Sequence, residues 1–148
     1  MSKIKIKILD NGKGLYKLEK ATIGSAGFDL IAAINNELTI NPNSSILVPC
    51  GFSLALPNNF EAQVRPRSGL ALKNMITVLN SPGTIDSDYR GEVCVILINH
   101  SKEIFNISSG MRIAQIIFKN IPNFEIVEVD ELNMTERGHG GFGSTGIN

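Results

Sequence analysis

Alternation of apolar and polar side chains is the sequence feature that most restricts how this chain can fold. At the N-terminus, Ile4, Ile6 and Ile8 alternate with lysines, and a period of two residues is typical of a half-buried β-strand. Similar short runs recur along the chain, separated by turn clusters such as Asn41-Pro42-Asn43. This spacing predicts an all-β sandwich or barrel. Besides 3–8, we expect strands at 37–40, 45–48, 52–56, 62–65, 77–79, 91–99, 104–107, 112–118 and 125–129.

Two of the expected strands are apolar on both faces. Residues 93–98 are apolar throughout, and in residues 113–118 only Gln115 interrupts one face. A strand of this kind is buried on both sides, so the face that does not meet the core needs a cover. A subunit interface and the interior of a sandwich would both supply one, and the pattern does not choose between them. One short helix is expected from about Ser68 to Asn74, with Ser68 as its cap.

Charge and hydrophobicity exclude several classes of protein. The 148 residues carry 14 Lys and Arg against 14 Asp and Glu, so overall positive charge does not attract nucleic acid. The 43% of apolar residues argues against a disordered chain. A signal-peptide core and an apolar run of roughly 20 residues are both lacking, so we expect no membrane contact and a cytoplasmic location. A P-loop and zinc-ligand spacing are lacking too. Cys94, inside an apolar run, is expected to be a buried small side chain.

The densest group of polar residues lies at 83–92, in the segment Gly-Thr-Ile-Asp-Ser-Asp-Tyr-Arg-Gly-Glu. Glycines bracket it and apolar strands flank it, which predicts a hairpin. The first interpretation is a solvated turn. The second is a divalent-metal site formed by Asp86 and Asp88. The third is a base, one of these aspartates, that activates water while Tyr89 packs on a sugar or a nucleobase.

Three further patches have a structural and a functional interpretation. Arg67-Ser68-Gly69 is either an ordinary helix start with a surface arginine or an anion site. Gln115, on an apolar strand, needs a hydrogen-bond partner, which is either structural or a ligand oxygen. Residues 133–148 contain five glycines and one aromatic side chain, Phe142. They are either a terminus without a role or an arm that clamps a ligand, because glycines let backbone N–H groups approach phosphates.

Five segments, taken in order, resemble the motifs of the trimeric dUTPase family. They are Ala26-Gly27-Phe28-Asp29-Leu30, Arg67-Ser68-Gly69-Leu70-Ala71, residues 83–93, Arg112-Ile113-Ala114-Gln115, and residues 137–146. The third and the fifth are long and specific, and together the five cover residues 26–146. Two departures are mild: Phe28 stands where the family often has Tyr, and His139 occupies a position that looks variable.

The resemblance implies an all-β, jelly-roll-like β-barrel of the dUTPase-like (β-clip) type. Residues 1–132 would form this domain, and residues 133–148 a mobile Gly-rich arm that closes over the active site. The implied partners are dUTP and two further copies of the chain, in a homotrimer whose active sites are shared between subunits. The implied reaction is hydrolysis of dUTP to dUMP and pyrophosphate with Mg²⁺, which keeps uracil out of DNA and supplies dUMP for dTMP synthesis.

The resemblance also implies a role for individual residues. Asp86 would orient and deprotonate the water that attacks the α-phosphate, and Tyr89 would lie under the deoxyribose. Asp29 would support the metal-bound waters or the framework of the site, and the triphosphate and waters would hold Mg²⁺ without a direct protein ligand. The other implied substrate contacts are Asn80, Gly83, Thr84 and Ile85 for uracil, Arg67, Ser68, Gly69 and Gln115 for the phosphates, and Arg137, Phe142, Gly143, Ser144 and Thr145 in the arm.

Elementary chemistry agrees with these roles. Hydrolysis of a phosphoanhydride needs a positioned water and neutralised phosphate charge rather than a covalent nucleophile. Two alternatives come from other classes. One is a dCTP deaminase of the same fold, and the other is a non-catalytic trimeric β module that uses the arm for binding.

Overall fold

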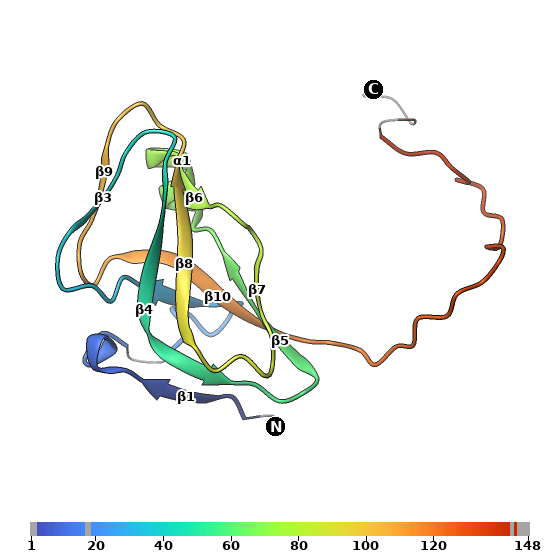
Figure 1. The fold of residues 1–148 in the computed structure, drawn as a ribbon, viewed down its shortest axis with the longest axis horizontal. Helices are drawn as coiled ribbons and strands as arrows, with labels where there is room; N and C mark the ends of the chain where they lie inside the picture. Colours follow the sequence, from blue (N-terminus) through green and yellow to red (C-terminus); the bar gives the residue numbers. More distant parts are fainter. Residues whose placement is uncertain (1–2, 17–18, 143, 145–148) are drawn as a thin grey trace.

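Two four-stranded antiparallel sheets form the body of the protein (Figure 1). The structure is a computed structural model that describes residues 3–16, 19–142 and 144. The first sheet has the order β1 (Lys5–Ile8), β4 (Ser45–Ala55), β8 (Glu92–Asn99) and β6 (Ile76–Val78). The second sheet has the order β2 (Phe28–Ile31), β10 (Arg112–Asn120), β5 (Phe60–Arg65) and β7 (Gly83–Ile85). A further pair joins β3 (Leu38–Ile40) to β9 (Phe105–Ile107), and the helical elements are η1 (Asp10–Gly12) and α1 (Ser68–Asn74).

The core lies between the two sheets and follows the alternation of the strands. In β8, Val93, Val95 and Leu97 are buried, whereas the residues between them are half-buried. The second sheet contributes Val64 and Ile116, a register pair, to the same apolar cluster. The outer face of β8 is therefore apolar but only partly covered within one chain, which leaves the expected cover to come from elsewhere.

The all-β class and most of the expected strands are confirmed. The strands expected at 45–48 and 52–56 are one strand, β4, whose register against β8 shifts between Pro49 and Ser53. Gly51, at this bulge, has a φ of +75°, which favours glycine. Periodicity did not predict β2 and β7, which span four and three residues. The expected strand at 125–129 is wrong, because this segment meets no strand partner in the described part of the chain.

Three smaller expectations have mixed outcomes. The helix spans Ser68–Asn74 as expected, but its cap residue is Arg67, and the described atoms include no side-chain capping bond. Cys94 is half-buried rather than buried, and Cys50 is the cysteine enclosed in the core. No helix of the described residues is long and apolar enough to cross a membrane.

A direct backbone contact joins η1 to the bulge of β4. A Cβ atom built on Gly12 would overlap the carbonyl group of Gly51 and lie 2.9 Å from its Cα. The Leu9 amide donates to the Gly51 carbonyl at 2.9 Å. Glycine at position 12 therefore lets the N-terminal segment rest on the first sheet without an intervening side chain.

We expect Gly12→Ala to destabilise the protein by about 2 kcal/mol or more, because the added methyl group must push two backbones apart. Thermal or urea unfolding measures the change. Gly24→Ala is the matched control, because no described atom lies within 4 Å of a Cβ built there. Equal stability of the two variants would contradict the close contact.

Candidate active site

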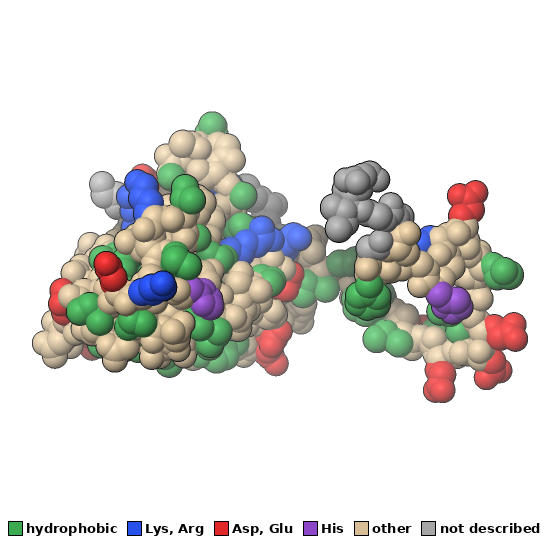
Figure 2. Space-filling view, turned by 90° about the horizontal axis from the view of Figure 1, so that it is seen from above, with side chains coloured by type: hydrophobic (Ala, Val, Ile, Leu, Met, Phe, Trp, Pro, Cys, Tyr) green, Lys and Arg blue, Asp and Glu red, His purple; other side chains and the backbone are tan. Residues whose placement is uncertain are grey.

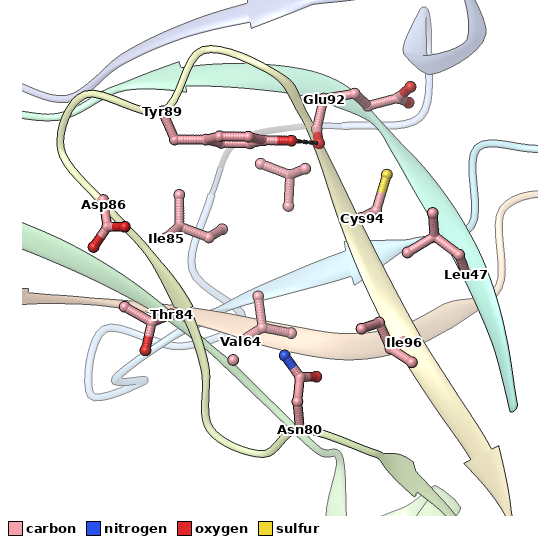
Figure 3. Close-up of a pocket in the computed structure, with 12 residues that line it drawn as sticks. Leu47, Val64, Asn80, Thr84, Ile85, Asp86, Tyr89, Glu92, Cys94 and Ile96 are labelled. Carbon is pink, nitrogen blue, oxygen red and sulfur yellow. Dashed lines mark hydrogen bonds between the residues drawn. The ribbon is translucent and has the colours of Figure 1, made fainter.

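A pocket of about 200 Å³ opens beside β7 and is lined by residues of both sheets (Figure 3). Val64 on β5 and the three residues of β7 line one side, and Cys94 and Ile96 on β8 line the other. The hairpin predicted for 83–92 is wrong in its pairing, because β7 pairs with β5 in the second sheet and β8 pairs with β4 and β6 in the first. Residues 86–91 instead carry the chain from one sheet to the other, and packed sheets lie about 10 Å apart. This crossing keeps the pocket open.

The crossing segment fixes Tyr89 through its own backbone. The Tyr89 hydroxyl donates to the Glu92 carbonyl at 3.0 Å, and the Tyr89 amide donates to the Asp86 carbonyl at 3.2 Å. A Cβ on Gly91 would overlap the tyrosine ring and lie 2.9 Å from its Cε2, so glycine allows the ring to fold back over the chain. The Asp86 side chain is exposed at the rim of the pocket (Figure 3).

Strand β7 and Asn80 supply the other predicted residues of the pocket. Gly83 and Ile85 are buried, and Thr84 is exposed. The Asn80 amide nitrogen lies 3.2 Å from the position of a Cβ on Gly83, so a larger residue at 83 would displace Asn80. The structure thus brings Asn80, Gly83, Thr84, Ile85, Asp86 and Tyr89 together around one pocket.

Cys94 is a titratable group of the pocket whose pKa is shifted. Burial raises the pKa of its thiol, and the carboxylate of Glu92 raises it further. The thiol is therefore protonated near neutral pH and contributes an apolar wall rather than a reactive thiolate.

A second group of predicted residues lies on the outer face of the second sheet. Asp29, Gln115 and Arg65 form a row across β2, β10 and β5. The Gln115 side-chain amide donates to the Pro66 carbonyl at 2.9 Å. That bond fixes the amide nitrogen and leaves the opposite side-chain oxygen beside Gly27, 3.2 Å from the position of a Cβ there.

Asp29 connects two arginines within this group. Its carboxylate oxygens lie 3.2 Å from Nε of Arg67 and 3.4 Å from Nη1 of Arg112. Arg67 also donates to the Arg112 carbonyl at 3.0 Å. The Arg67 guanidinium is therefore held beside the exposed start of α1, where Ser68 and Gly69 lie. Arg112 lies in one of the five motifs, but no role was predicted for it. Its partner Asp29 is 83 residues away, and such a distant pair leaves no signal in the sequence.

The third group lies in the C-terminal segment, which extends away from both sheets in Figure 1. Nε of Arg137 donates to the Gly140 carbonyl at 2.8 Å, and the Ser144 amide donates to the Gly141 carbonyl at 3.0 Å. Phe142 is fully exposed. Gly143 and Thr145, predicted to contact the ligand, lie outside the described residues.

One chain does not assemble these three groups. The pocket lies beside β7 and is lined by residues of both sheets, whereas the Asp29 group faces outward from the second sheet. No hydrogen bond or ion pair between described residues joins one group to another. Nor do the described residues include a group of three or more His, Cys, Asp or Glu side chains arranged to hold a metal ion.

A family model described as dUTPase matches residues 16–146. This chain belongs to the dUTPase family. A deoxyuridine 5'-triphosphate nucleotidohydrolase of Caulobacter vibrioides is 55% identical over 129 residues, which are 86% of this chain and 83% of that protein. One of Rickettsia felis is 54% identical over 147 residues, which are 99% of each chain. The family resemblance expected from the five motifs is thereby confirmed.

Solved dUTPases share the fold of this chain. A Staphylococcus bacteriophage 80alpha dUTPase with dUPNHPP aligns with a TM-score of 0.87 and 23% identity, over 99% of this chain and 100% of that one. A mutant dUTPase from phage phi11 of S. aureus, described with a structural Mg(II) ion, aligns with a TM-score of 0.78 and 18% identity, over 89% and 99%. The jelly-roll-like dUTPase fold expected from the sequence is confirmed.

We expect Asp29→Asn to raise the KM for dUTP about tenfold, because the neutral amide no longer holds Arg67 by charge. Stability should change by less than about 1 kcal/mol, since the pair is partly exposed. Steady-state kinetics and thermal unfolding measure the two effects. The control is Asp10→Asn, which removes another ion pair at the surface. An unchanged KM would show that Asp29 does not position the arginine.

Proposed function

We propose that this protein hydrolyses dUTP to dUMP and pyrophosphate, with Asp86 as the base that activates water. The observation that carries the activity is the family match over residues 16–146, because it spans all five motifs and agrees with relatives named deoxyuridine 5'-triphosphate nucleotidohydrolase. The exposed Asp86 carboxylate at the rim of the pocket can accept a proton from a water positioned in line with the α-phosphate. The alternative, dCTP deamination, has no support among these relatives.

The backbone of β7 suits recognition of uracil. β7 is the edge of the second sheet and pairs with β5 on one side only. The backbone N–H and C=O groups on its other side therefore meet no described strand and can hydrogen-bond the edge of a base. These groups cannot rotate to suit cytosine, and a wrong base would leave buried polar groups unpaired. Asn80, at the foot of the strand, adds a side-chain amide.

Tyr89 is proposed to lie under the deoxyribose. Its ring lines the same pocket as β7, and its hydroxyl is already occupied by the Glu92 carbonyl. The ring therefore offers an apolar face to the sugar rather than a hydrogen bond, and an added 2′-hydroxyl would lose its water without gaining a partner. The proposed effect is selection of deoxyribonucleotides over ribonucleotides.

The Asp29 group is proposed to bind the phosphates. Arg67 supplies a fixed positive charge, and Ser68 and Gly69 lie at the exposed start of α1. The Gln115 amide nitrogen donates one N–H to the Pro66 carbonyl and has a second N–H to donate to a phosphate oxygen. Asp29 already pairs with two arginines, which suits a site where Mg²⁺ arrives on the triphosphate rather than in a protein cage. When bound, the ion would neutralise phosphate charge.

We propose that a homotrimer brings the pocket of one copy to the Asp29 group of another. The segment 121–134, which leads into the Gly-rich arm and which we call the assembly arm, supports self-association, because it exposes large apolar side chains interspersed with acids (Figure 2). The edge strand β1 carries two exposed lysines, Lys5 and Lys7, and the exposed Lys3 precedes it. Beside it a groove of about 950 Å³ is lined by the apolar Ile6, Phe28 and Leu54, and the Asp29 group borders the same groove through Asp29, Arg112 and Gln115. An acidic, apolar arm from a neighbouring copy fits this basic, apolar edge.

The Gly-rich arm, residues 133–148, is proposed to be a lid that covers the domain formed by residues 1–132. Phe142 is fully exposed, which leaves its ring available to stack on uracil. Arg137 and Ser144, with Gly143 and Thr145, would hold the far phosphates. Closure would exclude bulk water from the reacting phosphate.

We expect Asp86→Asn to lower kcat for dUTP by about 10²- to 10⁴-fold and to leave nucleotide binding intact, because only the base is lost. Pyrophosphate release from dUTP, dCTP, dTTP and UTP, with and without Mg²⁺, measures activity and selectivity together. The control is Asp88→Asn, which alters an exposed carboxylate two residues away. Near-normal turnover by Asp86→Asn would refute the assigned base, and ammonia release from dCTP would indicate the deaminase.

Two truncations separate the lid from the assembly arm. Deleting 137–148 should leave a folded trimer with activity lowered by at least about 100-fold, because the body keeps its core and loses only the lid. Deleting 121–148 should also dissociate the trimer, because it removes the apolar segment proposed to dock on β1. Light scattering, thermal unfolding and the dUTP assay measure these outcomes. A trimer formed by the shorter protein would contradict docking of the arm.

A further inference from the structure

Tyr89 depends on the Glu92 backbone, and the Glu92 carboxylate is anchored to the bulge of β4. The Tyr89 hydroxyl donates to the Glu92 carbonyl at 3.0 Å (Figure 3). In the same view the Glu92 carboxylate points away from Asp86 and β7. Glu92 therefore joins two parts of the fold: its carbonyl accepts from the Tyr89 hydroxyl, and its carboxylate reaches the bulge of β4.

The Glu92 carboxylate completes the bulge of β4. One of its oxygens, Oε1, accepts from the Gly51 amide at 2.8 Å and from the Asn11 side-chain amide at 2.8 Å. Gly51 lies in the stretch where β4 and β8 lose their regular register, so its amide needs a partner from outside the ladder. Glu92 supplies that partner from the first residue of β8.

Asn11 is itself fixed by two constraints. Its amide nitrogen also donates to the Ala33 carbonyl at 3.1 Å. Its neighbour Gly12 rests directly on Gly51. The position of Glu92 is thus set by three segments distant in sequence and not by the crossing segment alone. They are η1, β4 and the segment that follows β2 at Ala33.

We propose that Glu92 and Asn11 are positioning residues that hold Tyr89 in place and thereby set the selection of dUTP over UTP. Without the two bonds to its carboxylate, the start of β8 and the Glu92 carbonyl are free to shift, and the tyrosine ring shifts with them. The expected effect on the choice between dUTP and UTP rests on the role proposed for Tyr89. The expected effect on the position of the tyrosine ring does not depend on that role.

The first measurement is selectivity, as the ratio of kcat/KM for dUTP to that for UTP. Glu92→Ala and Asn11→Ala should each lower this ratio about tenfold, mainly by improving the relative use of UTP. Glu92→Gln should retain it, because one amide oxygen can accept both bonds. The control is Asn106→Ala, which removes a side-chain hydrogen bond between β9 and β3 (Thr39 to Asn106, 3.0 Å) and should leave the ratio unchanged.

The second measurement reports on Tyr89 without substrate. The chain contains two tyrosines, so biosynthetic labelling with fluorotyrosine gives two ¹⁹F resonances, and Tyr89→Phe assigns them. The Tyr89 resonance should shift in Glu92→Ala and Asn11→Ala but not in Glu92→Gln or Asn106→Ala. If Glu92→Ala does not fold, Asn11→Ala decides.

Together the two measurements separate the positioning of Tyr89 from its proposed role in selecting the sugar. An unmoved Tyr89 resonance in folded Glu92→Ala or Asn11→Ala overturns the positioning role. A moved resonance with an unchanged dUTP-to-UTP ratio overturns the sugar-selecting role proposed for Tyr89 and leaves the positioning intact. A shift in Glu92→Gln as large as in Glu92→Ala would show that the negative charge, and not the pair of hydrogen bonds, fixes the ring.

Discussion

The change of sheet between β7 and β8 is the constraint on which the candidate site depends. β7 takes its hydrogen bonds from β5, and β8 takes its own from β4 and β6. The six residues between them must therefore bridge two packed layers, and the pocket is the space that this bridge leaves open. The aspartate and the tyrosine proposed for catalysis are both carried by the bridge.

A second consequence concerns the division of the site. One chain holds the pocket on one side of the second sheet and the phosphate-binding candidates on the other. Each half is structurally complete: Tyr89 has its carbonyl partner, and Arg67 has Asp29 and the Arg112 carbonyl. Neither half needs a ligand to be organised. Association of copies then only has to bring together two preformed surfaces, which limits the ordering cost at the site.

Much of the fold and of the candidate site could be predicted from local patterns in the sequence. Alternation indicated most strands and the all-β class, and glycines with paired polar residues indicated the segments that carry the site. What failed depended on partners elsewhere in the chain. The hairpin at 83–92 was wrong because pairing with β5 outweighs proximity, and the strand at 125–129 was wrong because no described strand of its own chain pairs with it. The link from Glu92 to Asn11 joins residues 81 positions apart, and neither residue type signals the other.

The edge position of β7 also has a consequence for how the protein can vary. In the proposed arrangement the base is read by main-chain groups of an edge strand, which every residue type except proline carries alike. A side-chain substitution at the exposed Thr84 leaves those groups where they are, so the choice of base is insulated from changes at that position. The choice of sugar rests instead on one aromatic ring and the carbonyl beneath it. The two specificities of the site therefore differ in how readily evolution can alter them.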